Sequence, residues 1–319
     1  MEIHPESARM GGGKRCPTPD FSTQTGDIMN HTDKNIFGDG ISWPTGILPE
    51  RIAETARKAA ARSSGILLDG MTRTIEVGYK GRIDLVTEID LASEKAIMET
   101  ISRDWPDHGF LAEESGRSMP SGGGPHRWII DPLDGTTNYA HRYPCFCISI
   151  AFESSGSLLY GLVVDPLRRM RFEAIAGRGA TLDGQNLSVS RETLPQRSLL
   201  ATGFSYSHAD TLRLKNMASF EGFSREVQGI RRSGSAALDL CHVAMGVLDG
   251  FWERGLSPWD TAAGTLIVRE AGGTVTDGQG HPFRLEAPLV VASNGSIHGW
   301  MVDKIRQIGE DPEQKPESL

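Results

Sequence analysis

The sequence predicts a layered α/β fold for a chain of 319 residues. Segments with apolar residues at helical spacing alternate with runs of short apolar strands, and this order favours helices packed in layers against sheets. The 37 glycines and 17 prolines exceed the average share of these residues, so tight turns are expected to be frequent. We expect no membrane-spanning helix, because no apolar run approaches the ~20 residues that a bilayer requires.

Four segments carry apolar residues at the spacing of a helix. The first, residues 48–71, has Pro49 in its first turn, where a missing N–H is tolerated. The second, residues 91–105, follows Asp90, which is expected to act as its N-cap. Two further helices are predicted over residues 235–251 and 260–273.

The strand predictions rest on short apolar runs bounded by turn residues. Asp183 and Gly184 have the composition of a two-residue hairpin turn, so the stretch 170–190 is expected to contain paired strands. The remaining predicted strands are residues 127–131, 145–153, 158–166 and 288–294.

The two ends of the chain are expected to be disordered. Residues 1–47 lack a sustained helical or strand period and contain no apolar stretch typical of a signal peptide. Residues 309–319 are equally polar. The folded part is therefore expected to span residues 48–308.

The charge balance argues against nucleic acid as a partner. The chain carries 41 acidic and 33 basic residues, a net charge of −8, so binding an anionic substrate would need another source of positive charge, such as a bound cation. The four cysteines lack the CxxC spacing of a zinc site. Cys145 and Cys147 lie in an apolar strand, and we expect reduced core thiols and a cytoplasmic location.

Acidic residues gather in four short strings of the sequence. Three of these strings can each be explained without chemistry, as a helix cap or a solvated charge pair. Their acids are Asp84 and Asp90 in DLVTEID, Glu113 and Glu114 in EES, and Asp260 in WDTAAG. The fourth string, WIIDPLDGTTN, places Asp131 and Asp134 at the end of an apolar strand, the edge at which α/β sheets bind ligands.

The residues after Asp134 have the composition of an anion site. Gly135, Thr136, Thr137 and Asn138 supply amides and hydroxyls that could open a helix and bind an anion. Two carboxylates beside such a site would repel the anion unless cations bridge them. Mg²⁺ commonly pairs one or two carboxylates with a substrate phosphate, so this string predicts a magnesium site.

The strings DLVTEID, EES, WIIDPLDGTTN and WDTAAG, in this order, resemble the inositol monophosphatase family of Mg²⁺-dependent phosphatases. The resemblance runs from about Leu48 to Ile308 and includes GRGATLDGQNLSVS and GIRRSGSAALDLC. It implies an alternating α-β-α-β-α sandwich of the inositol monophosphatase and sugar phosphatase type. It also implies a homodimer, with residues 48–308 as the catalytic domain.

The same resemblance implies roles for individual residues. Glu113 and Thr136 would orient the attacking water, with Asp90 holding Thr136. Lys80 matches the family's loop lysine only approximately, since its spacing to Asp84 is one residue shorter. The ligands for two or three Mg²⁺ ions would be Glu113, Asp131, the Leu133 carbonyl, Asp134 and Asp260. Substrate would contact Gly135, Thr136, Gly234, Ser235, Ala236, Glu253 and Asp260.

The function that the resemblance implies is hydrolysis of a phosphate monoester, with myo-inositol 1-phosphate as the leading substrate. Fructose 1,6-bisphosphate and histidinol phosphate are alternatives within the fold. An aspartyl-phosphate mechanism is rejected, because Asp131 and Asp134 are separated by two residues rather than one. The alternative from another class is a non-catalytic partner of the RNA and transcription machinery.

Overall fold

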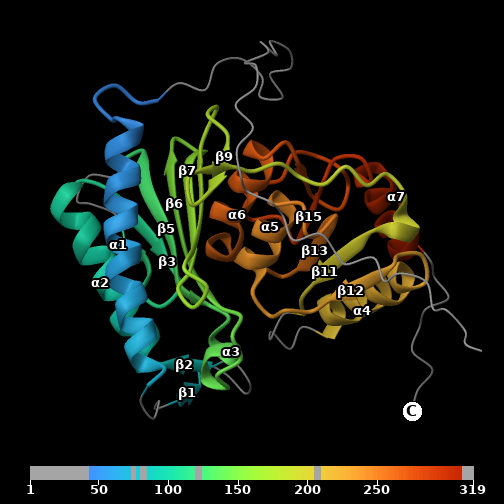
Figure 1. Cartoon of the computed structure of the whole chain (residues 1–319), viewed down its shortest axis with the longest axis horizontal. Coiled ribbons are helices and arrows are strands. Elements are labelled where there is room, and N and C mark those ends of the chain that lie inside the picture. Colours follow the sequence, from blue (N-terminus) through green and yellow to red (C-terminus); the bar gives the residue numbers. More distant parts are fainter. Residues whose placement is uncertain (1–42, 73–76, 80–84, 119–123, 205–209, 311–319) are drawn as a thin grey trace, which may run out of the picture. The chain divides into compact units, whose positions relative to one another are not determined.

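The structure is a computed structural model that describes residues 43–72, 77–79, 85–118, 124–204 and 210–310 (Figure 1). The predictions for Cys16, Lys80 and Asp84, and for most of the two ends of the chain, lie outside these residues. The domain boundaries therefore stay predictions. None of the helices described is both long and apolar enough to cross a bilayer.

An eight-stranded sheet forms one layer of the fold, in the order β10-β9-β8-β7-β6-β5-β3-β4. Its neighbouring strands are antiparallel except β3 and β5, which run parallel. The strands are β3 (Gly109–Ala112), β4 (Gly116–Ser118), β5 (His126–Asp134), β6 (Cys147–Ser154), β7 (Ser157–Asp165), β8 (Met170–Ile175), β9 (Ala180–Leu182) and β10 (Gln185–Asn186).

A second sheet of five strands has the order β12-β11-β13-β15-β14. Strand β11 pairs in parallel with both of its neighbours, and the other pairs are antiparallel. The strands are β11 (Leu199–Thr202), β12 (Gly229–Arg231), β13 (Gly250–Arg254), β14 (Thr274–Thr276) and β15 (Leu289–Ser293). A separate antiparallel pair joins β1 (Val77–Tyr79) to β2 (Leu85–Thr87).

Helices cover both sheets and fill the space between them (Figure 1). Helices α1 and α2 lie on one face of the first sheet, α5 and α6 lie between the sheets, and α4 and α7 cover the second sheet. This order confirms the predicted α-β-α-β-α sandwich. The helices are α1 (Pro49–Gly70), α2 (Glu88–Asp104), α3 (Thr136–Ala140), α4 (Asp210–Ser224), α5 (Ala236–Ala244), α6 (Pro258–Glu270) and α7 (His298–Glu310).

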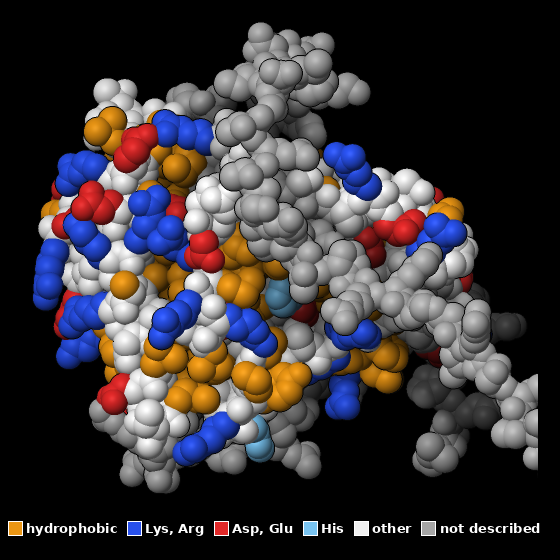
Figure 2. Space-filling model, in the orientation of Figure 1, with side chains coloured by type: hydrophobic (Ala, Val, Ile, Leu, Met, Phe, Trp, Pro, Cys, Tyr) orange, Lys and Arg blue, Asp and Glu red, His pale blue; other side chains and the backbone are white. Residues whose placement is uncertain are grey.

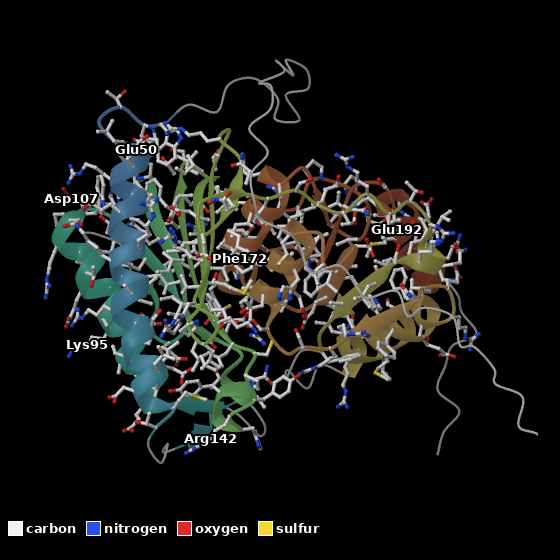
Figure 3. The ribbon with its side chains drawn as sticks, viewed as in Figure 1. Glu50, Lys95, Asp107, Arg142, Phe172 and Glu192 are labelled. Atoms are coloured by element: carbon white, nitrogen blue, oxygen red, sulfur yellow. The ribbon has the colours of Figure 1, made fainter. Side chains whose placement is uncertain are left out.

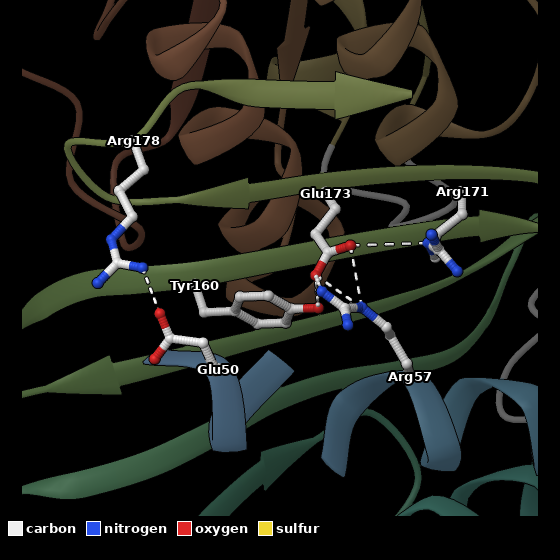
Figure 4. Close-up of polar contacts among 6 residues, drawn as sticks. All are labelled: Glu50, Arg57, Tyr160, Arg171, Glu173 and Arg178. Atoms are coloured by element: carbon white, nitrogen blue, oxygen red, sulfur yellow. Dashed lines mark hydrogen bonds and ion pairs between the residues drawn. The ribbon is translucent and has the colours of Figure 1, made fainter. Parts of the chain in front are cut away.

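Helix α1 is attached to the first sheet by a buried acid as well as by apolar packing. The Arg57 guanidinium donates to Glu173 in β8 at 2.7 Å, and the Tyr160 hydroxyl donates to the same carboxylate at 2.9 Å (Figure 4). Along the helix, Ile52, Ala56 and other small or apolar residues are fully buried. The predicted helix 48–71 is thus confirmed with its buried face on the sheet.

Two predictions for helix ends were wrong. Asp90 does not cap α2, because the helix already begins at Glu88, directly after β2, and the Asp90 side chain is buried within its first turn. The helix predicted over 235–251 ends at Ala244, since Gly246 adopts a φ of 72° and Gly250 opens strand β13. The Asp183-Gly184 turn is confirmed between β9 and β10.

Candidate active site

Glu113 and Asp131 lie side by side at the carboxyl ends of two parallel strands. In the β3–β5 register Ala112 is opposite Ile130, so the next residue of each strand is one of these acids. The Glu113 N–H donates to the Ile130 carbonyl at 3.2 Å, which continues the pairing by one step. The prediction that the sheet places acids at this edge is confirmed.

Strand β5 bends between its two aspartates. Its register with β6 shifts between Asp131 and Asp134, and the Leu133 N–H donates to Asp131 Oδ1 at 2.9 Å across the bend at Pro132. The shift lets Asp131 and Asp134 approach the same region although they are three residues apart, which a regular strand would not allow.

Asp260 reaches this region from helix α6. It is the third residue of the helix, and its Oδ2 accepts the N–H of Ser257 at 2.7 Å, which satisfies one of the helix's free amides. Helix α6 packs on strand β5, and Asp260 lies near enough to Asp131 for its charge to raise the pKa of Asp131. One carboxylate oxygen of Asp260 therefore secures the helix while the group as a whole lies beside Asp131.

Burial and neighbouring charges raise the pKa values of the three aspartates in this region. Burial raises the pKa of Asp131 well above its usual range, and the charges of Glu113, Asp134 and Asp260 raise it further. Burial and the charge of Asp134 likewise raise the pKa of Asp260, and burial raises that of Asp134 to about 6 despite its hydrogen bonds. Glu113, Asp134 and Asp260 thus lie near enough to Asp131 for their charges to affect its pKa.

The chemistry of these side chains fits a hard divalent cation. Among the residues that the structure describes, no three acidic, histidine or cysteine side chains are grouped as they stand to hold a metal ion. The acids at the ends of β3 and β5 nevertheless offer oxygen ligands, and the charges of Glu113, Asp134 and Asp260 all raise the pKa of Asp131. A Mg²⁺ ion would offset the repulsion and take these ligands in preference to nitrogen or sulfur.

Thr136 is held in place by α2 across the site. Its Oγ1 lies 3.0 Å from Asp90 Oδ1 and 3.1 Å from the Leu133 carbonyl, and it can donate to either. Asp90 is fully buried, so this contact replaces part of its hydration. The contact that the resemblance implied between Asp90 and Thr136 is present, while the catalytic roles of both residues stay predictions.

Gly135 is required by the backbone between Asp134 and α3. Its φ of 94° lies in the left-handed region, and an added Cβ would come within 2.9 Å of the Cys145 carbonyl. The five-residue helix α3 starts at Thr136, as the composition of this stretch predicted. Any side chain larger than hydrogen at Gly135 would displace the chain beside Asp134.

The Gly234-Ser235-Ala236 stretch is joined to the acidic strand. The Ser235 hydroxyl donates to Asp134 Oδ2 at 2.6 Å, and the Ala237 amide donates to the same oxygen at 2.8 Å. The N-terminus of α5 therefore faces Asp134 and stabilises its charge. Ser235 is 1% exposed and uses its hydroxyl on an acid of the site, and a contact with substrate stays a prediction for these three residues.

Glu253 lies at the edge of the same acidic region. Burial raises its pKa well above the usual range, as do the charges of Asp260, Asp239 and Asp134, while the Arg232 charge opposes this. Asp239 on α5 accepts the Ser233 hydroxyl at 2.6 Å, and burial raises its pKa to about 7. Asp239 was not foreseen, although an acid inside the apolar string SAALDLC was a visible signal.

The cysteines of the described residues are core thiols, as predicted. Cys145, Cys147 and Cys241 are free and buried, and burial raises the pKa of each. Cys147 Sγ lies 3.7 Å from Asp134 Oδ2 and donates to it. These thiols are protonated at neutral pH, so they pack beside the site without competing for a metal ion.

Known proteins are similar to this chain in sequence and in fold. The model of the inositol monophosphatase family matches residues 48–310. A Synechocystis protein named inositol-1-monophosphatase is 44% identical over 246 residues, which cover 77% of this chain and 85% of that protein. The Nus factor SuhB of Pseudomonas aeruginosa is 43% identical over 240 residues, covering 74% of this chain and 89% of that protein.

A solved structure shows the same arrangement. The inositol monophosphatase from Anabaena superimposes with a TM-score of 0.73 and 40% sequence identity, covering 81% of this chain and 96% of that one. The fold and the related proteins together identify this protein as a phosphatase. The chain belongs to the inositol monophosphatase family.

Replacing Asp131 with Asn should stabilise the protein in the absence of metal. The amide keeps an acceptor for the Leu133 N–H but removes a buried charge that Glu113 and Asp260 repel. We expect the melting temperature measured with a chelator to rise by about 2 °C or more, the response of a domain of this size to roughly 1 kcal/mol. Millimolar Mg²⁺ should raise the melting temperature of the wild type but not of Asp131→Asn.

The matched control is Asp183→Asn, which removes an acid from the β9–β10 turn. It should leave both measurements unchanged. A variant Asp131→Asn that melts below the wild type in chelator and still responds to Mg²⁺ would contradict the assignment of Asp131 to a metal site.

Proposed function

We propose that the protein hydrolyses a phosphate monoester with Mg²⁺ as cofactor, and that this substrate is myo-inositol 1-phosphate. The observation that carries the proposal is the burial of Asp131 beside Glu113, Asp134 and Asp260, an arrangement that repels itself unless cations are bound. Relatives named inositol-1-monophosphatase support the choice of substrate.

The metal ligands in this proposal are four carboxylates and one backbone oxygen. They carry a charge of about −4, and a phosphate monoester adds about −2, so two or three Mg²⁺ would bring the site near neutrality. When bound, Mg²⁺ supplies charge stabilisation to the phosphoryl oxygens and lowers the pKa of water. The ligands are Glu113, Asp131, the Leu133 carbonyl, Asp134 and Asp260.

The attacking water is oriented by Glu113 and Thr136. Because Thr136 has one hydroxyl proton and uses it on Asp90 or on the Leu133 carbonyl, its Oγ1 can accept a hydrogen bond from water. The Glu113 carboxylate accepts a hydrogen bond from the second O–H of the same water. Together the two acceptors direct an oxygen lone pair at phosphorus, and positioning of this kind is the main contribution of a protein to phosphoryl transfer.

The substrate lies between two segments of chain. The amides of Gly135 and Thr136 hold phosphate oxygens at the start of α3, where partial positive charge is available. Glu253 and Asp260 accept inositol hydroxyls, and the backbone of Gly234 and Ala236, with Ser235 between them, completes the pocket. Glu253 is buried next to the acids of the site, which supports a place close to the reacting phosphate.

Phosphate release from a panel of compounds tests the proposal. We expect release that depends on Mg²⁺, stops with a chelator and is fastest with inositol 1-phosphate. The other compounds are fructose 1,6-bisphosphate, histidinol phosphate and 3′-phosphoadenosine 5′-phosphate, with Asp131→Asn as the inactive control. Faster release from another compound would reject inositol 1-phosphate, and release that persists in chelator would reject the metal mechanism.

Thr136→Ala should reduce turnover more than binding. Without the hydroxyl the water loses one of its two acceptors, and we expect kcat to fall by roughly 100-fold or more while KM changes little. Steady-state kinetics at saturating Mg²⁺ measures both constants. Thr137→Ala removes the adjacent hydroxyl and should leave them unchanged, whereas a large rise in KM at constant kcat for Thr136→Ala would assign the hydroxyl to substrate binding instead.

We further propose a homodimer in the cytoplasm. Tyr143, Leu167 and Val247 expose 56%, 37% and 52% of their surfaces, and hydrophobic side chains gather between basic ones on the face shown in Figure 2. The Val247 N–H donates to the His242 carbonyl, and burial, together with the nearby Arg168 charge, lowers the pKa of His242. The reduced thiols of the core support a reducing compartment, which cell fractionation would test.

The dimer can be tested by light scattering at micromolar protein concentration. The wild type should have twice the mass of one chain, and Val247→Glu should reduce that mass by placing a charge in the contact. Leu194→Glu, a change at another exposed leucine, is the control and should remain dimeric. A wild type that is monomeric at this concentration would reject the proposal.

A second candidate function is a role in transcription. It is favoured by the relatives named Nus factor SuhB, one of them 43% identical to this chain. A binding partner does not need the acidic site, whereas a phosphatase does. If Asp131→Asn fully replaces the wild type in cells while releasing no phosphate in vitro, binding rather than hydrolysis is the function that cells require.

A further inference from the structure

Helix α2 buries a polar stripe in its first two turns. Asp90, Ser93 and Glu94 occupy positions i, i+3 and i+4, which place them on one face, and none is more than 4% exposed. The next turn continues the face with Ile97, which is fully buried, while Lys95 points outward from the layer (Figure 3). The two buried carboxylates of this stripe must have hydrogen-bond partners, because burying an acid without partners is costly.

Glu94 is bonded to two consecutive backbone amides. Its Oε2 accepts the Glu114 N–H at 2.8 Å, and its Oε1 accepts the Ser115 N–H at 2.9 Å. Both donors belong to the turn between β3 and β4, the turn that carries Glu113. Hydrogen bonds of an amide to a carboxylate are shorter and stronger than those between neutral groups, so the pair fixes this turn firmly.

The backbone of Glu113 is thereby held on both sides. Before the turn, its own N–H is bonded to the Ile130 carbonyl of β5, and after it, the next two N–H groups are bonded to Glu94. The direction in which the Glu113 side chain leaves the chain is set by these three bonds. Glu94 acts on the site through Glu113, which lies close enough to Asp131 to raise its pKa.

The rest of the stripe contacts the other parts of the site. Ser93 Oγ donates to the Pro132 carbonyl, between the two aspartates, at 3.0 Å, and Ser63 of α1 lies 2.6 Å behind it. Asp90 accepts the Thr136 hydroxyl. One face of α2 thus contacts three segments that are far apart in the sequence. Of Asp90, Ser93 and Glu94, only Glu94 reaches the Glu113 turn in the hydrogen bonds described above.

We propose that Glu94 is a positioning residue for the metal ligand Glu113. The proposal rests on the metal-dependent phosphatase function proposed above. In it, Glu94 orients the Glu113 carboxylate so that this group can bind the cation. Loss of the two amide bonds lets the turn move, so the protein keeps its fold and its other acids but binds metal more weakly. The defect is in metal affinity, and raising the Mg²⁺ concentration corrects it.

Metal binding tests this directly. Mn²⁺ titration followed by the electron paramagnetic resonance signal of free Mn²⁺ reads affinity without substrate. Glu94→Gln keeps the size of the side chain but places an NH₂ group against one backbone N–H, and we expect roughly 10- to 100-fold weaker binding, the usual effect of losing a group that orients a ligand. Phosphatase activity of Glu94→Gln should recover as Mg²⁺ is raised, with kcat approaching that of the wild type.

The matched control is Glu173→Gln, which alters another buried glutamate, held by hydrogen bonds from the side chains of Arg57 and Tyr160 and located away from the site in β8 (Figure 4). It should lower the melting temperature and leave Mn²⁺ affinity unchanged. If Glu94→Gln does not fold, Glu94→Asp replaces it, because a side chain shorter by one methylene cannot span both amides and should weaken Mn²⁺ binding in the same way.

A double-mutant cycle with Glu113→Gln separates positioning from general disturbance. If Glu94 acts through Glu113, adding Glu94→Gln to Glu113→Gln should weaken Mn²⁺ binding by less than about twofold. Additive losses, or wild-type affinity in Glu94→Gln or Glu94→Asp, would overturn the proposal. If the wild type releases no phosphate but Glu94→Gln still weakens Mn²⁺ binding through Glu113, the proposed function fails while the positioning role holds.

Discussion

The rest of the structure depends on the repulsion among four acids gathered at one end of the first sheet. Burial and the charges of neighbouring acids raise the pKa values of Asp131, Asp134 and Asp260, so the protein holds these groups beside Glu113 against their mutual repulsion. Apolar packing alone would let such a cluster relax or take up protons. What opposes this is a set of hydrogen bonds that helices α2, α5 and α6 make to the acids or to the backbone beside them.

The two helix layers on either side of the first sheet contribute to that restraint. From the layer between the sheets, the first turn of α5 donates to Asp134, and α6 carries Asp260 in its own first turn. From the outer layer, α2 contacts the Glu113 turn, the Pro132 carbonyl and Thr136. The first turns of α5 and α6 place partial positive charge next to the acids, which a strand end or loop would supply less well. The positions of these helices therefore stabilise the charge of the site as well as the fold.

Much of this could be predicted from the sequence, because the acids stand in short strings with a fixed order. The end of the WIID strand predicted where Asp131 would lie, and the glycine after Asp134 predicted the turn into α3. Asp90 was wrongly predicted to be a helix cap, because an aspartate near the start of a helix can serve either as a cap or in a buried contact, and the sequence does not distinguish the two. Glu94 was missed because a glutamate within a helix is usually solvent-exposed, and its partners are backbone amides, which leave no trace in the sequence. The end of α5 was missed because its pattern continues past Gly246.

The bonds from Ser235 and Ala237 to Asp134 link residues about one hundred positions apart in the chain. A ribosome delivers Asp134 long before it delivers the serine that restrains it. Until α5 has docked, the nascent first sheet presents an incomplete acidic edge, and such distant pairings form late in folding because loop closure must precede them. Asp134 therefore gains these two hydrogen bonds only after α5 has been made and has docked on the first sheet.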